Sequence, residues 1–276
     1  MPQTPLRQMS IKHGGDLVTT TYTSYRLISQ DLTKSLERVA AKPDVKLETE
    51  YYLSKIGDIK SIDDFMADSR LYNYALKAHG LEDMAYAKAF IRKVLTEGVD
   101  DKEAFANKLA DSRYGDLVKS LNFATHGAAA TSFDRATKGV VDKYTRQTLE
   151  QDAGNDNNGV RLALYFERTA STIKSGLDIL ADDALIQVVR TTLQMPAETI
   201  ATDIDKQAAY LDRVLNIADF KDPEKVGKFL ERFTAMWEME NPSDNYDPLA
   251  VFGGSSGHGI STDLLLSINN LKLGGS

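Results

Sequence analysis

Ile-Lys-Ser-Ile-Asp-Asp-Phe-Met-Ala-Asp, residues 59–68, decides how this chain is organised, because a related stretch occurs a second time. Residues 173–182 read Ile-Lys-Ser-Gly-Leu-Asp-Ile-Leu-Ala-Asp, and six of the ten positions are identical without gaps. Phe65 and Met66 are replaced by Ile179 and Leu180, so the apolar character is kept. The two stretches predict an internal duplication, in which Ser61 and Ser175 occupy equivalent helix-start positions.

Three further pairs of segments carry the same relationship along the chain. They are Ser35–Glu37 with Thr148–Glu150, Tyr51–Leu53 with Leu164–Phe166, and Phe90–Leu95 with Tyr210–Leu215. The last pair requires a small insertion near Pro196 in the second copy. We therefore expect two related helical halves, residues 25–125 and 126–240. The connection at His126-Gly127 is short, so we expect the halves to pack together.

Apolar residues recur at steps of three and four through both halves, which is the spacing of one helix face. Residues 28–39 predict one helix on this pattern. Ser61 begins another, with Asp64 placed as in a capping box, and this helix is expected to run to His79-Gly80. No run of β-branched residues alternates with polar ones for long enough to indicate a strand. The sequence predicts an all-α fold.

Further expectations concern the middle of the chain and the core. Met84–Leu95 is predicted to be a helix that ends at Gly98, and Ala153–Gly159 is predicted to be a loop. The residues expected to be buried are Phe65, Leu71, Ile91, Leu95, Leu185, Leu211, Leu215 and Phe233.

The two ends of the chain differ from the helical halves. Residues 1–24 are predicted to be a flexible tail, and residues 241–259 a linker rich in Pro, Asn, Asp, Gly and Ser. Residues 260–276 follow as a short amphipathic helix. Its predicted partner-binding residues are Leu264, Ile268 and Leu271, which line one stripe, and Leu265 alongside. Two alternatives stay open: the segment docks on its own domain, or it engages a groove on a partner or on a second copy.

Composition limits the classes of partner and compartment. The net charge of −7 argues against a nucleic-acid partner, and the basic residues form no polybasic membrane patch. The chain has no cysteine, and neither a secretory signal peptide nor a stretch long enough to insert in a membrane. We expect a soluble protein that is cytoplasmic, or exported by a route without a cleaved signal peptide.

The histidines and one glycine-rich stretch invite a chemical interpretation. Each of His13, His79, His126 and His258 precedes a glycine, and none has the spacing of a zinc site. His79 and His126 are predicted to end helices, where a cationic imidazole favours the negative pole. Residues 254–261 have the glycine spacing of a phosphate-binding loop, but Ile260 stands where lysine belongs. A hinge before the last helix is the better interpretation.

Paired acids do not form a convincing catalytic set. They occur at Asp63-Asp64, Asp100-Asp101 and Asp182-Asp183, where helix starts explain them through the positive helix end. Asp156 and its neighbouring asparagines offer oxygens for a cation, but they lack the alternation and terminal Glu of a calcium loop. The sequence therefore predicts no catalytic residues, no cofactor, no metal and no enzymatic activity.

Two runs of the first half resemble a known family. They are Asp-Ile-Lys-Ser-Ile-Asp-Asp-Phe, residues 58–65, which continues through residues 70–78, and Gly-Leu-Glu-Asp-Met-Ala-Tyr-Ala-Lys-Ala-Phe-Ile-Arg-Lys-Val-Leu, residues 80–95. Together they resemble a bacterial family catalogued as domain of unknown function 1217, over most of residues 25–240. Members are often encoded among flagellar genes, chiefly in alphaproteobacteria. The resemblance implies an all-helical fold and a flagellar context, and it implies no catalytic residues.

These observations support two hypotheses of different kinds. The leading hypothesis is a non-enzymatic helical protein that binds a protein partner in flagellar assembly or structure, with self-association as an option. The alternative is a small-molecule or ion-binding protein, such as a degenerate enzyme, with a site between the two halves lined by tyrosines such as Tyr51, Tyr52 and Tyr165. A deep cleft with convergent polar groups would favour the alternative.

Overall fold

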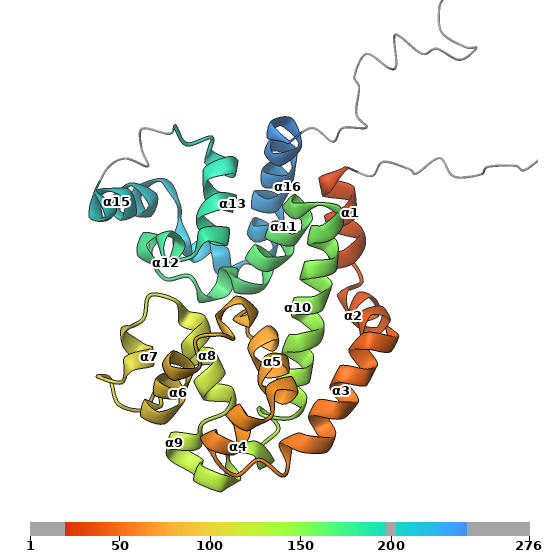
Figure 1. Cartoon of the computed structure of the whole chain (residues 1–276). Helices are drawn as coiled ribbons and strands as arrows, with labels where there is room; N and C mark the ends of the chain where they lie inside the picture. The colour runs from red at the N-terminus through yellow and green to blue at the C-terminus, as the bar shows by residue number, and fades with distance from the viewer. Residues whose placement is uncertain (1–19, 197–202, 242–276) are drawn as a thin grey trace, which may run out of the picture. The chain divides into compact units, whose positions relative to one another are not determined.

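The computed structural model of the chain describes residues 20–196 and 203–241. Within these two ranges every regular element is a helix, which confirms the predicted fold class there (Figure 1). The first α-helices are α1 (Thr21–Ser29), α2 (Leu32–Ala40), α3 (Pro43–Ile56), α4 (Ile62–Ala67), α5 (Ser69–Ala78), α6 (Lys88–Glu97), α7 (Phe105–Lys108), α8 (Ser112–Ser120) and α9 (Phe123–His126). They are followed by α10 (Lys138–Asp156), α11 (Asn158–Thr169), α12 (Gly176–Leu180), α13 (Asp183–Leu193), α15 (Ile204–Val214) and α16 (Pro223–Glu240). Short 3₁₀ helices are η1 (Glu82–Met84), η2 (Gly127–Ser132), η3 (Ala170–Thr172) and η4 (Ile217–Lys221).

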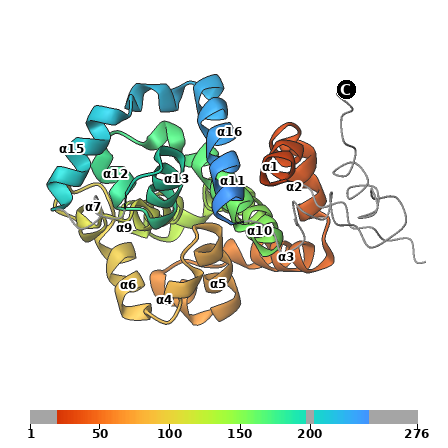
Figure 2. The ribbon, with the colours of Figure 1, turned by 90° about the horizontal axis from the view of Figure 1, so that it is seen from above.

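Helix α10 lies at the centre of the compact unit formed by Thr21–Met239. It contacts α2, α5 and α11, and Figures 1 and 2 show α2 and α3 on one side of it and α5 on the other. Buried Val140 and Leu149 lie nine residues apart and therefore on opposite sides of α10, so the helix is buried on more than one face. Such a helix needs other helices packed on it from several sides.

Buried apolar side chains form two clusters. The first contains residues from Val39 to Leu149, and the second contains Tyr25 together with residues from Ala153 to Trp237. The division between them falls inside α10. All eight residues predicted for the core are buried. The first helix is the exception to chain order, because Tyr25 of α1 packs in the second cluster.

Two predicted helices are each divided in two, and aspartate is the cause both times. α1 ends at Ser29, and Asp31 then caps α2 by accepting a hydrogen bond from the Lys34 backbone N–H. The predicted helix from Ser61 to His79 breaks at Asp68, whose carboxylate accepts from the backbone N–H groups that begin α5. An Asp side chain that satisfies backbone donors favours a new helix start over continuation. The apolar spacing continued across both breaks, so the prediction of single helices was wrong.

Three predicted boundaries are also corrected. Thr21–Ser24 are already helical, although residues 1–24 were expected to be a tail. The predicted loop Ala153–Gly159 is almost entirely helical, because α10 runs to Asp156 and only Asn157 separates it from α11. Asn157 caps α11 by accepting from the Gly159 N–H, so one residue replaces the expected loop. Met84 belongs to η1, and α6 begins only at Lys88.

The stretches that suggested a duplication adopt the same local structure. Ser61 and Ser175 are both N-cap residues, of α4 and α12, as expected. The side chain of each accepts from the backbone N–H three residues on. The Tyr51 hydroxyl donates to the Asp68 carboxylate at 2.7 Å, and 114 positions later the Tyr165 hydroxyl donates to Asp182 at 2.5 Å.

The ends of α5 and α13 also match. The Leu81 N–H bonds to the Leu76 carbonyl, and the Met195 N–H bonds to the Arg190 carbonyl, which is the six-residue bond of a Schellman motif. This motif requires a left-handed residue one position earlier. Gly80 fills it at φ +67° in the first copy, but Gln194 fills it at φ +50° in the second. Among the described residues, Gln194 is the only non-glycine with positive φ.

Replacing Gln194 by glycine is therefore expected to stabilise the protein by about 0.5–1 kcal/mol. Glycine removes the left-handed strain of a side-chain-bearing residue, and its greater freedom in the unfolded chain offsets part of that gain. Urea denaturation would measure the change. The matched control is Gly80→Ala, which places a Cβ on a left-handed residue and should lose a comparable amount. A loss of stability in Gln194→Gly would contradict the strain argument.

Candidate functional site

The predicted partner-binding residues Leu264, Leu265, Ile268 and Leu271 lie outside the described residues. The same holds for the glycine-rich residues 254–261, for His13 and for His258. The candidate sites below therefore come from the part of the chain that the structure describes.

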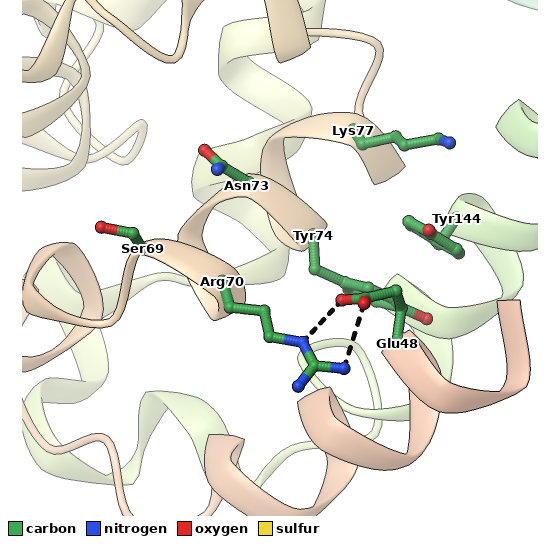
Figure 3. Close-up of a pocket in the computed structure, with 7 residues that line it drawn as sticks. All are labelled: Glu48, Ser69, Arg70, Asn73, Tyr74, Lys77 and Tyr144. Atoms are coloured by element: carbon green, nitrogen blue, oxygen red, sulfur yellow. Dashed lines mark hydrogen bonds and ion pairs between the residues drawn. The ribbon is translucent and has the colours of Figure 1, made fainter. Parts of the chain in front are cut away.

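A shallow surface hollow of about 410 Å³ opens where α3, α5 and α10 meet. Its lining residues are Glu48, Ser69, Arg70, Asn73, Tyr74, Lys77 and Tyr144 (Figure 3). Arg70 donates from Nε and Nη2 to the Glu48 carboxylate at 2.8 and 3.0 Å, and its guanidinium lies 4.0 Å above the ring of Tyr51. The Lys77 ammonium lies 5.1 Å from the ring centre of Tyr144. The hollow thus offers a fixed ion pair, a cation and an aromatic wall.

Three tyrosines stack beneath this hollow. Tyr52 stacks on Tyr74 with ring centres 4.5 Å apart, and Tyr74 stacks on Tyr144 at 3.8 Å. Tyr52 is fully buried and donates to the Ala136 carbonyl. Burial raises the pKa of Tyr52, Tyr74 and Tyr144, so these hydroxyls stay protonated near neutral pH. The stack is mainly a contact between helices, with only its Tyr74–Tyr144 end reaching the hollow.

The tyrosines proposed for a site between the halves do not come together in one site. Tyr51 is bonded to Asp68 and Tyr165 to Asp182, each across its own pair of helices. Tyr52 is held by Ala136 in the first core cluster. Their hydroxyls are used in local structural bonds rather than pointing into a common cleft.

A second hollow, of about 510 Å³, lies between α4 and α6. Met66, Ala67 and Ala89 contribute apolar surface to it, and the rim carries the ion pair between Arg92 and Asp63 at 2.5 Å. Both of these charged side chains are largely exposed, so the pair is worth little to stability.

A buried serine, a buried histidine and a partly buried lysine meet beside the first core cluster. His79 Nε2 lies 2.9 Å from Ser120 Oγ and 3.2 Å from Lys143 Nζ, and Lys143 donates to Ser120 Oγ at 2.9 Å. These residues come from α5, α8 and α10. A hydroxyl beside two bases is the arrangement that activates a serine nucleophile. Here Ser120 is 3% exposed and lines neither of the two hollows, so its hydroxyl is held between helices in this structure.

The protonation state of this cluster follows from its contacts. His79 Nδ1 lies 2.7 Å from the Ala75 carbonyl, which can only accept, so Nδ1 carries the proton and Nε2 accepts. Burial and the neighbouring ammonium of Lys143 lower the pKa of His79 from 6.5 to about 4. Burial also lowers the pKa of Lys143. His79 does lie at the end of α5, as predicted, but it is a neutral hydrogen-bonding group and not a cation at the helix pole.

The sequence offered no signal for this cluster, since Ser120 lies 41 positions from His79 and Lys143 lies 64 positions from it. No sequence motif surrounds Ser120 or Lys143 that would distinguish them from the other serines and lysines of the chain. Only the packing of α8 and α10 against α5 brings these residues together.

A second buried polar group joins α10 to α11. Glu150 is 2% exposed and accepts from Arg146 Nε at 2.8 Å. Arg168 donates to both Glu150 oxygens, from Nε at 2.8 Å and from Nη2 at 2.9 Å. Arg146 also donates to the Leu164 carbonyl. The two guanidinium groups thus share one carboxylate, which is the pattern of a structural ion-pair network.

The paired aspartates that the sequence analysis considered as catalytic residues lie at helix starts or in turns. Asp64 and Asp182 accept hydrogen bonds from backbone N–H groups at helix starts. Asp101 accepts from the Glu103 N–H in a turn, and the predicted helix start at Asp100-Asp101 is wrong because α7 begins at Phe105 with Ala104 as its N-cap. Hydrogen bonds from Ser61 and from backbone N–H groups lower the pKa of Asp64. In residues 20–196 and 203–241 no three His, Asp or Glu side chains gather as they would to hold a metal ion. Over the same ranges no helix is long and apolar enough to cross a membrane.

Two of three comparisons with known proteins place the chain in a family. A family model described as Protein of unknown function (DUF1217) matches residues 78–226. A solved crystal structure, that of Protein AGR_C_984 from Agrobacterium tumefaciens, is 72% identical in sequence and superposes with a TM-score of 0.76. That alignment covers 80% of this chain and 94% of the Agrobacterium chain. A search of curated proteins finds no match. The family match and the close relative agree with the all-helical fold, and this chain belongs to the DUF1217 family.

Proposed function

We propose that this protein is a non-enzymatic helical protein that works by binding another protein, in flagellar assembly or structure. The observation that carries the proposal is the fate of the side chains that could perform chemistry. Ser120, His79 and Glu150 are each at least 93% buried and bonded between helices. Such groups hold the helices in place and cannot reach a substrate. The flagellar part of the proposal rests on the gene context implied by the family resemblance.

The first and last of the described helices, α1 and α16, are joined by hydrogen bonds. The Thr21 backbone N–H donates to the Glu238 carboxylate at 2.9 Å, and the Thr21 hydroxyl bonds to the same oxygen. Asn157 donates to the Thr21 hydroxyl at 2.9 Å. Because a carboxylate at a helix N-terminus is favourable, these bonds fix the start of α1 against the end of α16.

We further propose that the two halves are an ancient duplication. The matched serine caps, the matched Tyr–Asp bonds and the shared helix-end motif all support it. A duplicated helical unit provides two similar surfaces without requiring a catalytic centre. The test is a superposition of residues 45–120 on residues 160–238, in which shared helix order and packing are expected. Unrelated packing would remove the duplication.

Deletion of residues 255–276 is expected to leave the melting temperature nearly unchanged while abolishing partner binding or self-association. The reason is that Leu264, Ile268 and Leu271 would present one apolar stripe to the partner. Melting temperature would be measured by circular dichroism. Binding would be measured by affinity purification from flagellated cells, with cell and filament fractions compared, and self-association by light scattering of the purified chain.

A matched pair of point variants sharpens this test. Ile268→Asp places a charge on the stripe, and Asn269→Asp places the same charge beside it. Only Ile268→Asp should lose the partner. A large loss of stability with binding intact would show that the segment belongs to the folded core and would overturn the proposal.

The hollow at α3, α5 and α10 is the observation that favours the alternative, a small-molecule or ion-binding site. Tyr144 lies in residues 126–240 and the other lining residues lie in residues 25–125, so the hollow is at a junction between the predicted halves. Its fixed Arg70–Glu48 pair and the cation Lys77 would suit a small polar ligand with an aromatic face. A ligand screen by thermal shift tests this, with Lys77→Ala expected to lose any stabilisation that the wild type gains.

A further inference from the structure

The contact between buried His79, buried Ser120 and partly buried Lys143 can hold one positive charge but not two. His79 Nε2 and Lys143 Nζ are 3.2 Å apart, and His79 is 7% exposed. Its Nδ1 proton is donated to the Ala75 carbonyl, so any added proton must go on Nε2. A proton there removes the acceptor that Lys143 uses and places two cations in contact in a medium of low dielectric.

No nearby acid is placed to offset that second charge. Among the helices packed on His79, α8 contributes Asp116, the carboxylate whose field reaches both His79 and Lys143. Asp116 is more than half exposed and already paired with Lys119 at 3.1 Å. Arg113 of α8 donates to the Gly80 carbonyl next to His79 but is paired with Asp111, and Arg168 of α11, whose charge acts on Lys143, is paired with Glu150. Among the described residues, the groups within hydrogen-bond distance of the imidazole are the Ala75 carbonyl, the Ser120 hydroxyl and the Lys143 ammonium, and none is a carboxylate.

The position of the cluster gives protonation a structural consequence. Ala78 and Leu76 of α5, Leu117 and Val118 of α8, and Val140 and Tyr144 of α10 belong to the same buried cluster that surrounds it. The side chains of His79, Ser120 and Lys143 make a polar contact where α5, α8 and α10 pack together. If the imidazolium and the ammonium separate, the helices that carry them must move or one group must reach water.

We propose that His79, Ser120 and Lys143 form an acid-operated joint that holds α5, α8 and α10 together while the imidazole is neutral and releases them when it takes up a proton. The second buried cluster contains no histidine and is not released by this step. The joint is independent of the proposed partner binding. It makes the first cluster the part of the molecule that opens in mild acid.

The expected pH range follows from the two states of His79. Its pKa is about 4 when folded and 6.5 when exposed, so between these values the unfolded or opened form binds more protons. The contact is therefore intact above pH 6.5 and loses stability as the pH falls towards 4. The opening equilibrium constant should rise up to about tenfold per pH unit, or roughly 300-fold in total.

The experiment is a pH titration of the full chain with hydrogen exchange as the readout. Between pH 6.5 and 4, amides of α5, α8 and α10 should lose protection in the wild type before those of α11 and α13. His79→Gln keeps a side chain that can accept from Lys143 but cannot take up a proton. In this variant, the amides of α5, α8 and α10 should lose protection at the same pH as those of α11 and α13. Exchange rates are corrected for their own pH dependence with the unfolded chain.

His126→Gln is the matched control, because His126 is only partly buried, lies beside Phe133 and is outside both clusters. It should keep the wild-type profile. Should His79→Gln fold poorly, the second arm is nuclear magnetic resonance of the His79 ring in the wild type and in Lys143→Met, where loss of the ammonium should raise the pKa of His79. The joint is overturned if His79→Gln opens over the same pH range as the wild type, or if the His79 ring titrates near 6.5 with α5 protected throughout.

Discussion

Replacing Glu150 by alanine is expected to destabilise the protein by about 3–5 kcal/mol. Glu150 is almost fully buried and is the carboxylate that both Arg146 and Arg168 contact. Its loss leaves two guanidinium groups without their anion, and Arg146 is itself only 11% exposed. The cost comes from this uncompensated buried charge and exceeds the value of the ion pairs themselves. For a fold with an ordinary stability of about 5–15 kcal/mol, such a loss brings unfolding close to ambient temperature.

Urea denaturation followed by circular dichroism would measure this change. The matched control is Asp152→Ala on the same helix, which removes the exposed pair with Lys42 at 2.8 Å. That variant should lose no more than about 1 kcal/mol, because both partners are well solvated. Equal effects of the two substitutions would show that the Glu150 network is not desolvated as the structure indicates.

Replacing Phe65 by alanine is expected to cost about 3–5 kcal/mol. The Phe65 ring is fully buried and packs edge-on against Tyr72 at 5.6 Å and against Phe123 at 6.2 Å. Its removal forfeits the burial of a large apolar side chain and leaves a cavity at the contact of α4, α5 and α9. Collapse of those helices into the cavity would recover only part of the loss.

Trp237 makes a useful probe for this variant, since it is the single tryptophan and lies in the second cluster. Its fluorescence and the circular dichroism of the whole chain should lose structure at the same urea concentration if the two clusters unfold together. Phe133→Ala is the control, because Phe133 is 40% exposed and should lose about 0.5–1 kcal/mol at most. Near-wild-type stability of Phe65→Ala would remove Phe65 from the core.

Local sequence patterns predicted well wherever a few neighbouring residues decide the structure. The serine starts of α4 and α12 were predicted from Ser61 and Ser175, because a cap needs only its own side chain and the next turn. The burial of Phe65 and Leu211 followed from helical spacing. The same reasoning failed at Asp68, where the apolar spacing ran on across a capping residue. It also failed at Asn157. A loop was expected there, but this single residue connects α10 to α11 and caps α11.

The candidate sites were not predictable in this way. Serine and lysine are residue types that usually lie at the surface. His79, which contacts both Ser120 and Lys143, lies 41 and 64 positions away from them in the chain. The left-handed Gln194 likewise reads as an ordinary residue, although its counterpart Gly80 was recognised as a helix end. The predicted partner-binding stripe around Ile268 lies outside the described residues and stays a prediction.

By itself, the sequence determined that the described part of this chain is helical, that the eight predicted core residues are buried, and that residues 59–68 and 173–182 each start a helix at a serine. Those properties depend on contacts within about one or two helical turns, and such contacts follow from the spacing of apolar and capping residues in the local sequence. Only the tertiary structure decided that α10 runs through the middle, that Tyr25 of α1 joins the second cluster, and that Glu150 and His79 are buried among cations. It also decided that Gly159 must lack a side chain, because a Cβ there would lie 2.4 Å from the Trp237 ring. The reason is that burial and electrostatic environment are set by which helices meet, and that choice depends on contacts between residues far apart in the chain.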